Sequence, residues 1–307
     1  MLISIVIPVY QAEKILEELI RRIKAAMEFT LGDYTVVLVD DGSTDDSWNV
    51  ITKITSSHKN IRAIKLSRNF GQHHAITAGL DHCIGSWVVV MDCDLQDRPE
   101  EIKNLYLKAC EGFDIVFAKR MVRKDPFFKK KSSALFYRLY SYLTGIKYDG
   151  TVANFGIYNQ KVIEVLKTMR EPLRAFAPMV RWVGFNKAFI EVEHGQRYAG
   201  KSTYNYRKVF HLATNIILSY SDKPLKLIIR LGLMISLLSF LIGGYYLVSY
   251  FSGKVLVSGY TSIIISIWFL GGLIILNLGV IGLYISKIFT GIKERPLYII
   301  DKKINVD

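Results

Sequence analysis

The sequence has few cysteines and few acidic residues for its length. Cys83, Cys93 and Cys110 are the only cysteines among 307 residues, and no two of them stand in CxxC spacing. This pattern indicates neither a disulfide framework nor a zinc site, and it is typical of a protein whose thiols stay reduced in the cytosol. We expect Cys83 and Cys110 to be buried small apolar side chains. The 40 Lys and Arg outnumber the 27 Asp and Glu, which gives a net charge of +13.

Two stretches near the C-terminal end have no charged residue at all. They run from Leu231 to Phe251 and from Val255 to Ser286. About 20 apolar residues span a bilayer, so two transmembrane helices are predicted; a buried helical hairpin is the alternative. Basic residues flank both stretches, and this predicts that both flanks lie in the cytoplasm and that the chain crosses the inner (cytoplasmic) membrane more than once. These flanking residues are Lys223, Lys226, Arg230, Lys287, Lys293 and Arg295.

The first 118 residues alternate between short apolar runs and segments with helical spacing. We expect Met1–Tyr10 to contain a strand rather than a signal peptide, because it has no basic leader. Alternation of this kind predicts an open, mostly parallel α/β sheet flanked by helices, in which ligands bind at the carboxyl ends of the strands. The expected strands are Ile3–Val9, Thr35–Val39, Arg62–Leu66, Trp87–Met91 and Ile115–Ala118.

Paired acidic residues follow two of these strands. Asp40 and Asp41 come after the second strand, and Asp92 and Asp94 come after the fourth. Clustered carboxylates repel one another unless a cation lies between them, and Mg²⁺ is typically held by one or two carboxylates together with substrate phosphates. The pattern therefore indicates a site for a divalent cation and a diphosphate; helix capping by Asp is the alternative interpretation.

Four motifs occur in a particular order: PVYQAE at 8–13, DDGSTD at 40–45, LSRNFGQHHAITAG at 66–79 and DCDLQDRPE at 92–100. Together they resemble the family 2 glycosyltransferases of GT-A fold. An RxxGxSxY segment at 197–204, SYSDKPL at 219–225 and GLYISKIFTGIKERPLYII at 282–300 narrow the resemblance to membrane-bound polyprenyl-phosphate glycosyltransferases. The resemblance implies inverting transfer of a sugar from a nucleotide-diphosphate sugar, UDP being favoured, to a polyprenyl monophosphate, with Mg²⁺ or Mn²⁺ as cofactor.

The resemblance also assigns residues to the site. The nucleotide sugar is expected at Pro8, Tyr10, Glu13, Asp40, Asp41, Asp92, Cys93 and Lys201, and the metal at Asp92, Asp94 and Gln96. The expected catalytic residues are Asp94, Arg120, Asn154 and Arg197, and the acceptor phosphate is expected at Lys129 and Ser133. The chain departs from the family pattern at Gln11, Cys93, Arg98, Lys129 and Asn154, where relatives usually have Asn, a small residue, Pro, Arg and Asp.

Asn154 bears on the mechanism because an amide cannot serve as a general base. A phosphate monoester has its second pKa near ~6, so a lipid phosphate is largely dianionic at neutral pH. We therefore expect Asn154 to position the sugar or the phosphate by hydrogen bonding.

Two segments have competing interpretations. The basic and aromatic run at 119–131 is typical of a membrane interface; a solvated surface and nucleic-acid binding are the alternatives, and we expect no nucleic acid. Residues 195–202 match the phosphate-loop pattern GxxxxGKS, but an ATPase would need further strands where the apolar stretches follow. A membrane-bound family 2 enzyme with a glycan or other hydroxyl acceptor, or a non-enzymatic membrane scaffold, are the other functions that fit.

The expected organisation has four parts. Residues 1–205 form a cytoplasmic catalytic domain, 206–226 an interfacial amphipathic helix and linker, 227–288 two transmembrane helices and 289–307 a cytoplasmic tail. The expected partners are the nucleotide sugar, the polyprenyl phosphate and the membrane. A homo-oligomer is compatible with the sequence, which leaves the number of copies open.

Overall fold

The computed structural model describes residues 2–30, 33–120, 152–193, 223–252 and 259–306. The chain divides into two compact units. The first comprises Met1–Leu139, Ile146–Asn205 and Arg295–Asp307, and the second comprises Tyr140–Gly145 and Tyr206–Glu294. Residues 295–307 thus belong to the same unit as the N-terminal residues, whereas 289–307 were predicted to form a separate cytoplasmic tail.

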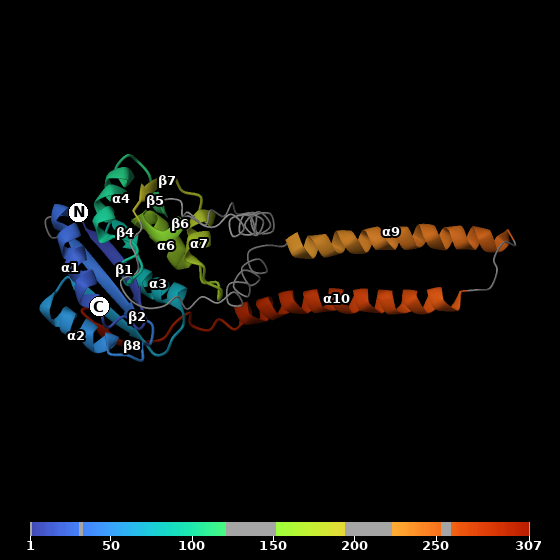
Figure 1. Cartoon of the computed structure of the whole chain (residues 1–307), viewed down its shortest axis with the longest axis horizontal. Helices are drawn as coiled ribbons and strands as arrows, with labels where there is room; N and C mark the ends of the chain where they lie inside the picture. The colour runs from blue at the N-terminus through green and yellow to red at the C-terminus, as the bar shows by residue number, and fades with distance from the viewer. Residues whose placement is uncertain (1, 31–32, 121–151, 194–222, 253–258, 307) are drawn as a thin grey trace. The chain divides into compact units, whose positions relative to one another are not determined.

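The first unit is built on a mixed sheet whose described strands follow the order β7-β5-β6-β4-β1-β2-β3-β8 (Figure 1). Strands β4, β1, β2 and β3 run parallel to their neighbours within that group, and β5 is parallel to β7. Antiparallel pairs join β4 to β6, β5 to β6 and β3 to β8. The strands are β1 (Ile3–Val9), β2 (Tyr34–Asp40), β3 (Ile61–Leu66), β4 (Trp87–Val90), β5 (Ile115–Arg120), β6 (Val152–Asn159), β7 (Lys187–Val192) and β8 (Ile300–Ile304).

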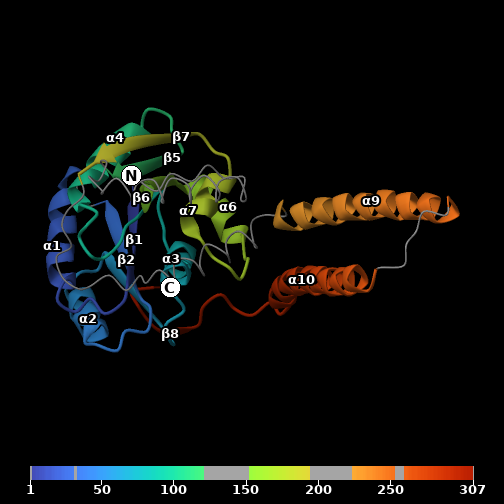
Figure 2. The same ribbon diagram turned by 45° about the vertical axis from the view of Figure 1, so that its right-hand side comes forward.

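Helices cover both faces of this sheet. Helices α1 (Leu16–Ala26), α2 (Ser47–Ser57) and α4 (Ile102–Ala109) lie on one face, and α3 (Gln72–Asp81), α6 (Gln160–Thr168) and α7 (Phe176–Trp182) lie on the other (Figure 2). Two short 3₁₀ helices, Glu28–Thr30 and Pro99–Glu101, follow α1 and precede α4. The predicted α/β sheet with flanking helices is confirmed.

The central strands of the sheet could be predicted from the sequence because both of their faces are buried. All seven residues of β1 are buried, and so are six of the seven in β2. Parallel strands covered on both faces are near-continuous apolar runs, and the five expected strands match β1 to β5 to within two residues at either end. Helix α3 lies close against β1, because a Cβ added at Gly79 would come within 2.3 Å of Val6 Cγ1.

Strands β6 and β8 were not predicted. Strand β6 inserts antiparallel between β4 and β5, and β8 forms an edge next to β3 although the two are separated by more than 200 residues of chain. Sequence reasoning also expected Cys110 to be buried; this is wrong, since Cys110 is exposed just after α4, while Cys83 is buried as predicted.

The second unit contains helices α9 (Lys223–Phe251) and α10 (Tyr260–Ile292). Each includes a segment long and apolar enough to cross a membrane, Leu225–Ile242 and Phe269–Ile292, and none of either segment is buried inside the protein. These helices overlap the two predicted uncharged stretches. Most of the expected interfacial helix and linker at 206–226 and most of the basic run at 119–131 lie outside the described residues.

Candidate active site

The carboxyl ends of β1, β2 and β4 meet at one edge of the sheet. Val9 at the end of β1 is paired with Asp40 at the end of β2, and the Asp41 N–H donates to the Val9 carbonyl at 2.8 Å. On the other side of β1, Val6 is paired with Val90. The Met91 N–H, directly before the DCD segment, donates to the Val6 carbonyl at 3.2 Å. The structure thus brings the PVY, DDG and DCD segments together, as parallel strands require.

Asp41 is a buried carboxylate that binds the loop between β3 and α3. It accepts hydrogen bonds from the Phe70 N–H at 2.7 Å and the Gly71 N–H at 2.9 Å. Burial raises the pKa of Asp41, and these two backbone donors oppose that rise. The carboxylate therefore fixes the start of α3 relative to the end of β2.

Asp40 is fully buried and less completely paired. Its Oδ1 accepts from the Ser43 N–H at 3.1 Å, whereas its Oδ2 has no hydrogen-bond partner among the described residues. Burial raises the pKa of Asp40, and the hydrogen bonds from Ser43 partly offset the effect. A buried carboxylate oxygen without a partner is costly, so a hydrogen-bond donor that reached this atom would stabilise it.

The turn after β2 is held by short-range and cross-loop contacts. Gly42 has φ +67°, and a Cβ there would lie 2.5 Å from the Arg68 carbonyl carbon, so only glycine lets the two loops approach this closely. Glu13 accepts from the Asp46 N–H at 3.0 Å, and the Gln11 side chain donates to Thr44 at 3.0 Å. Pro8 is buried within β1, while Tyr10 is exposed at the edge.

The DCD segment follows β4 and is half-buried. Gln72, the first residue of α3, donates from Nε2 to Asp92 Oδ1 at 2.6 Å, and the Gln96 N–H donates to Asp94 Oδ1 at 3.1 Å. Leu95 has φ +60°, an uncommon conformation for a bulky residue, and its side chain is buried. Strain of this kind is concentrated at functional sites. Burial and the neighbouring carboxylates Asp92 and Asp94 raise the pKa of Cys93 to about 12, so it is a neutral thiol.

The residues expected to hold a metal fit a hard divalent cation. Asp92 and Asp94 offer carboxylate oxygens two positions apart, and Gln96 offers an amide oxygen. Among the described residues no group of three or more His, Cys, Asp or Glu side chains is placed to hold a metal ion. Two carboxylates are sufficient for Mg²⁺, which takes its remaining ligands from water and substrate phosphates.

Asn154 lies on β6 beside the same edge. The antiparallel register pairs Val90, the last residue of β4, with Gly156, and Asn154 lies on β6 two residues before Gly156. A Cβ at Gly156 would come within 2.7 Å of the Val116 carbonyl oxygen, so glycine allows β5 and β6 to approach closely here. Arg120 is the last residue of β5. Lys129, Ser133, Arg197 and Lys201 lie outside the described residues.

Gln72 is the residue of this site that sequence reasoning missed. It lies within the LSRNFGQHHAITAG motif, which contributed to the family resemblance but to none of the predicted site residues. The available signal was the position itself, since a polar residue that begins a helix after a parallel strand lies at the ligand-binding edge of the sheet.

The fold and the acidic edge define a glycosyltransferase of GT-A type. The chain belongs to the family Glycosyl transferase family 2, whose model matches residues 4–166. The structure is similar to that of glucosyl-3-phosphoglycerate synthase from Mycobacterium tuberculosis in complex with Mn²⁺, UDP and phosphoglyceric acid. The TM-score is 0.52 and the sequence identity 16%, over 70% of this chain and 76% of that one. At this identity the likeness establishes the fold alone.

Relatives are similar over nearly the whole length. The chain is 36% identical to the uncharacterized glycosyltransferase YkcC of Bacillus subtilis, over 99% of this chain and 94% of the relative. It is 34% identical to the bactoprenol glucosyl transferase of Shigella phage SfII, over 98% of both. It is 33% identical to the undecaprenyl-phosphate 4-deoxy-4-formamido-L-arabinose transferase of an Enterobacter species, over 99% and 94%. The predicted resemblance to polyprenyl-phosphate glycosyltransferases is confirmed.

Proposed function

We propose that this glycosyltransferase moves a sugar from a nucleotide-diphosphate sugar, a UDP-sugar being favoured, to a polyprenyl monophosphate at the cytoplasmic face of the inner membrane. One combination of features carries the proposal: a GT-A unit with carboxylates gathered at its strand ends occurs in the same chain as two long apolar helices. Relatives that cover both parts are named for bactoprenol or undecaprenyl phosphate. An enzyme with a soluble acceptor would not require the two apolar helices.

In this proposal the donor binds along the edge formed by β1, β2 and β4. Asp40 Oδ2 would accept a hydrogen bond from the base or the ribose, which supplies the partner that this buried oxygen lacks within the described chain. Asp41 would keep the adjoining loop in place through Phe70 and Gly71. Pro8, Tyr10 and Glu13 would line the nucleotide from β1 and the loop that follows, with Cys93 below it as an apolar contact.

Asp92, Asp94 and Gln96 would hold Mg²⁺ or Mn²⁺. Gln72 supports this assignment because it orients Asp92 from a separate element, and partners of this kind fix ligand geometry in metal sites. The cation, when bound, would neutralise charge that develops on the departing diphosphate. Arg120, Arg197 and Lys201 would add positive charge to the same task.

The acceptor needs positioning more than activation. Its phosphate is largely dianionic at neutral pH, because the second pKa of a phosphate monoester is near ~6. Asn154, on the strand β6 that pairs with β4, would hold the sugar or this phosphate by hydrogen bonds, and Lys129 and Ser133 would bind the phosphate itself. Direct attack of a phosphate oxygen on the anomeric carbon, with departure of the nucleoside diphosphate, inverts that carbon. An α-linked donor would therefore give a β-linked lipid phosphosugar.

The test is transfer by the purified full-length chain in detergent, with Mn²⁺, undecaprenyl phosphate and a panel of labelled nucleotide sugars. We expect one donor to give label in the organic phase, with a β linkage by NMR. We expect Asp94→Asn to reduce turnover at least a hundredfold, because the amide loses a charged ligand of the cation. Asp301→Asn is the matched control, since Asp301 is exposed on the edge strand β8, and it should retain activity.

Three outcomes would contradict the proposal. Absence of lipid-soluble label with every donor would exclude the acceptor, and label in a water-soluble glycan would favour the hydroxyl-acceptor enzyme instead. Nucleotide-sugar binding without any turnover would favour a scaffold. Full activity of Asp94→Asn would remove the metal assignment alone.

A further inference from the structure

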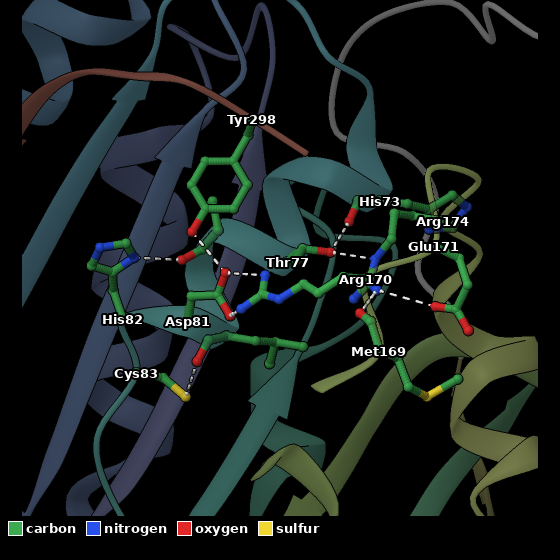
Figure 3. A network of polar contacts seen from close by, with 12 residues as sticks. His73, Thr77, Asp81, His82, Cys83, Met169, Arg170, Glu171, Arg174 and Tyr298 are labelled. Atoms are coloured by element: carbon green, nitrogen blue, oxygen red, sulfur yellow. Dashed lines mark hydrogen bonds and ion pairs between the residues drawn. The ribbon is translucent and has the colours of Figure 1, made fainter. Parts of the chain in front are cut away.

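A cluster of polar side chains joins the last residue of α3 to the C-terminal segment. The Tyr298 hydroxyl donates to Asp81 Oδ2 at 2.7 Å, and Arg170 donates to both oxygens of Asp81 at 2.8 and 3.0 Å (Figure 3). The Asp81 side chain is only 12% exposed. Burial raises the pKa of Tyr298, as does the hydrogen bond to Asp81. The hydroxyl therefore remains protonated at neutral pH and donates.

Ile299, the residue after Tyr298, contacts the beginning of the segment that ends at Asp81. The Ser67 N–H donates to the Ile299 carbonyl at 2.9 Å, immediately before β8 pairs with β3. Ser67 begins the loop that leads into α3, and Asp81 ends the helix. Tyr298 and Ile299 thus hold both ends of the segment 67–81, although more than 200 residues separate them from it in the sequence.

The segment 67–81 carries contacts to the donor edge. Phe70 and Gly71 present their N–H groups to Asp41, and Gln72 donates to Asp92. Helix α3 has ten residues, which corresponds to a rod of about 15 Å. Its tight packing on β1 at Gly79 lets it transmit a displacement at one end to the other rather than absorb it, because packed interiors are close to incompressible.

We propose that Tyr298 is a positioning residue of the donor site. By fixing Asp81, together with Arg170, it holds α3 so that Gln72 orients Asp92 and the loop before α3 remains bound to Asp41. The proposal rests on the proposed function only in naming the ligand: the chemistry recognised is a nucleoside diphosphate with a divalent cation. Loss of a residue that contacts a metal ligand directly, as Gln72 contacts Asp92, typically lowers metal affinity about ten- to a hundredfold. Tyr298 is two contacts further from the ligand than Gln72, so we expect a smaller effect.

The experiment compares the full-length chain with Tyr298→Phe, which removes one hydroxyl and keeps the ring. We expect the Kd of UDP in the presence of Mn²⁺, measured by calorimetry, to rise about three- to tenfold, because the supported contacts in this site are charge-assisted. The donor KM should rise by the same factor while kcat stays within about twofold. Hydrogen exchange of the Phe70 and Gly71 amides, measured without ligand, should accelerate.

Tyr106→Phe is the matched control. Tyr106 lies on α4 and contacts the ring of Trp87 at the start of β4, so it is at the opposite end of the strands from the donor edge. It should lose stability without change in Kd, KM or exchange at residues 70 and 71. Asp81→Asn serves as a second variant, and the double variant with Tyr298→Phe should weaken UDP binding by less than the product of the two single effects.

The inference is overturned if Tyr298→Phe matches Tyr106→Phe in UDP affinity and in the exchange of these amides, whatever its melting temperature. If the unaltered chain binds no nucleoside diphosphate at all, the proposed function fails. Exchange at Phe70 and Gly71 then decides by itself whether Tyr298 positions this loop.

Discussion

The two units of this chain differ in where they place charged and apolar side chains. The first unit buries charge: Asp40 is fully buried and Asp41 is 3% exposed, both at strand ends. The second unit exposes apolar surface: on α10, Ile275 is 72% and Ile274 60% exposed. Buried charge and exposed apolar side chains each cost free energy in water.

The difference indicates what each unit binds. A buried carboxylate edge is stabilised by hydrogen-bond donors and cations, which a nucleotide sugar with a divalent metal supplies. A helix that is apolar all round is stabilised by lipid. In the proposed function, the nucleotide sugar and its cation would stabilise the buried carboxylates of the first unit, and lipid would stabilise the apolar helices of the second. Variants that change only the buried charge or only the exposed apolar surface therefore test the two assignments separately.

The largest effect is expected from a charge on the second unit. Ile275→Lys places an ammonium near the middle of α10, and a charged residue at the centre of a spanning helix costs about 2.5–3.5 kcal/mol in insertion. The carbonate-resistant membrane fraction of the full-length chain should fall accordingly. Leu107→Lys is the control, because Leu107 is 54% exposed on α4 in the first unit. There the same substitution should change stability by no more than about 0.5 kcal/mol.

Equal membrane retention of the two lysine variants would contradict the membrane assignment of α10. Loss of retention in Leu107→Lys alone would place the lipid-facing surface on the first unit instead.

A smaller effect is expected from Asp41→Asn. The amide can accept only one of the two N–H groups that now bind the carboxylate, and its own NH₂ would face the other. Loss of a buried pairing costs about 1–3 kcal/mol, and urea unfolding of the detergent-solubilised chain should show it. Asp40→Asn is the contrasting variant, because Oδ2 of Asp40 has no hydrogen-bond partner among the described residues. If both variants lose the same stability, the difference in pairing between the two carboxylates is not what matters.

The smallest effect concerns pH. Burial raises the pKa of Asp40 above its ordinary value of 3.8. The folded chain therefore binds this proton more tightly than the unfolded chain, so the contribution of Asp40 to stability falls as the pH rises from about 4 through the raised pKa and is constant above it. Asp40→Asn removes this dependence, and its stability relative to the unaltered chain should be higher at pH 7 than at pH 4. An unchanged difference across this range would contradict a raised pKa. Asp40→Asn should also weaken the binding of UDP, because Asp40 is a proposed nucleotide contact.

The sequence predicted the parts of the fold whose pattern is local. Strands such as β1 and β2 are continuous apolar runs because both faces are buried, and the residues directly after them carry the acidic pairs. Parallel pairing alone brings these residues to one edge of the sheet. A contact between the ends of β1 and β2, such as that of Asp41 with Val9, could therefore be predicted.

The parts that escaped prediction depend on distant pairing. Strand β8 has a charged sequence, IDKKI, that is typical of an exposed edge and carries no strand signal of its own. It becomes a strand because β3 offers an open edge. The bond between Gln72 and Asp92 and the cluster around Asp81 join segments that are 20 and more than 200 residues apart, and no spacing rule in one sequence reports such contacts.

The central claim is that Asp92 and Asp94 hold a cation together with a nucleoside diphosphate. Electron paramagnetic resonance of Mn²⁺, titrated into the purified chain with and without UDP, tests it most directly. The account predicts that UDP tightens Mn²⁺ binding in the unaltered chain and in Asp301→Asn, and that Asp94→Asn abolishes this enhancement. Enhancement of equal size in Asp94→Asn, or none in the unaltered chain, would contradict it.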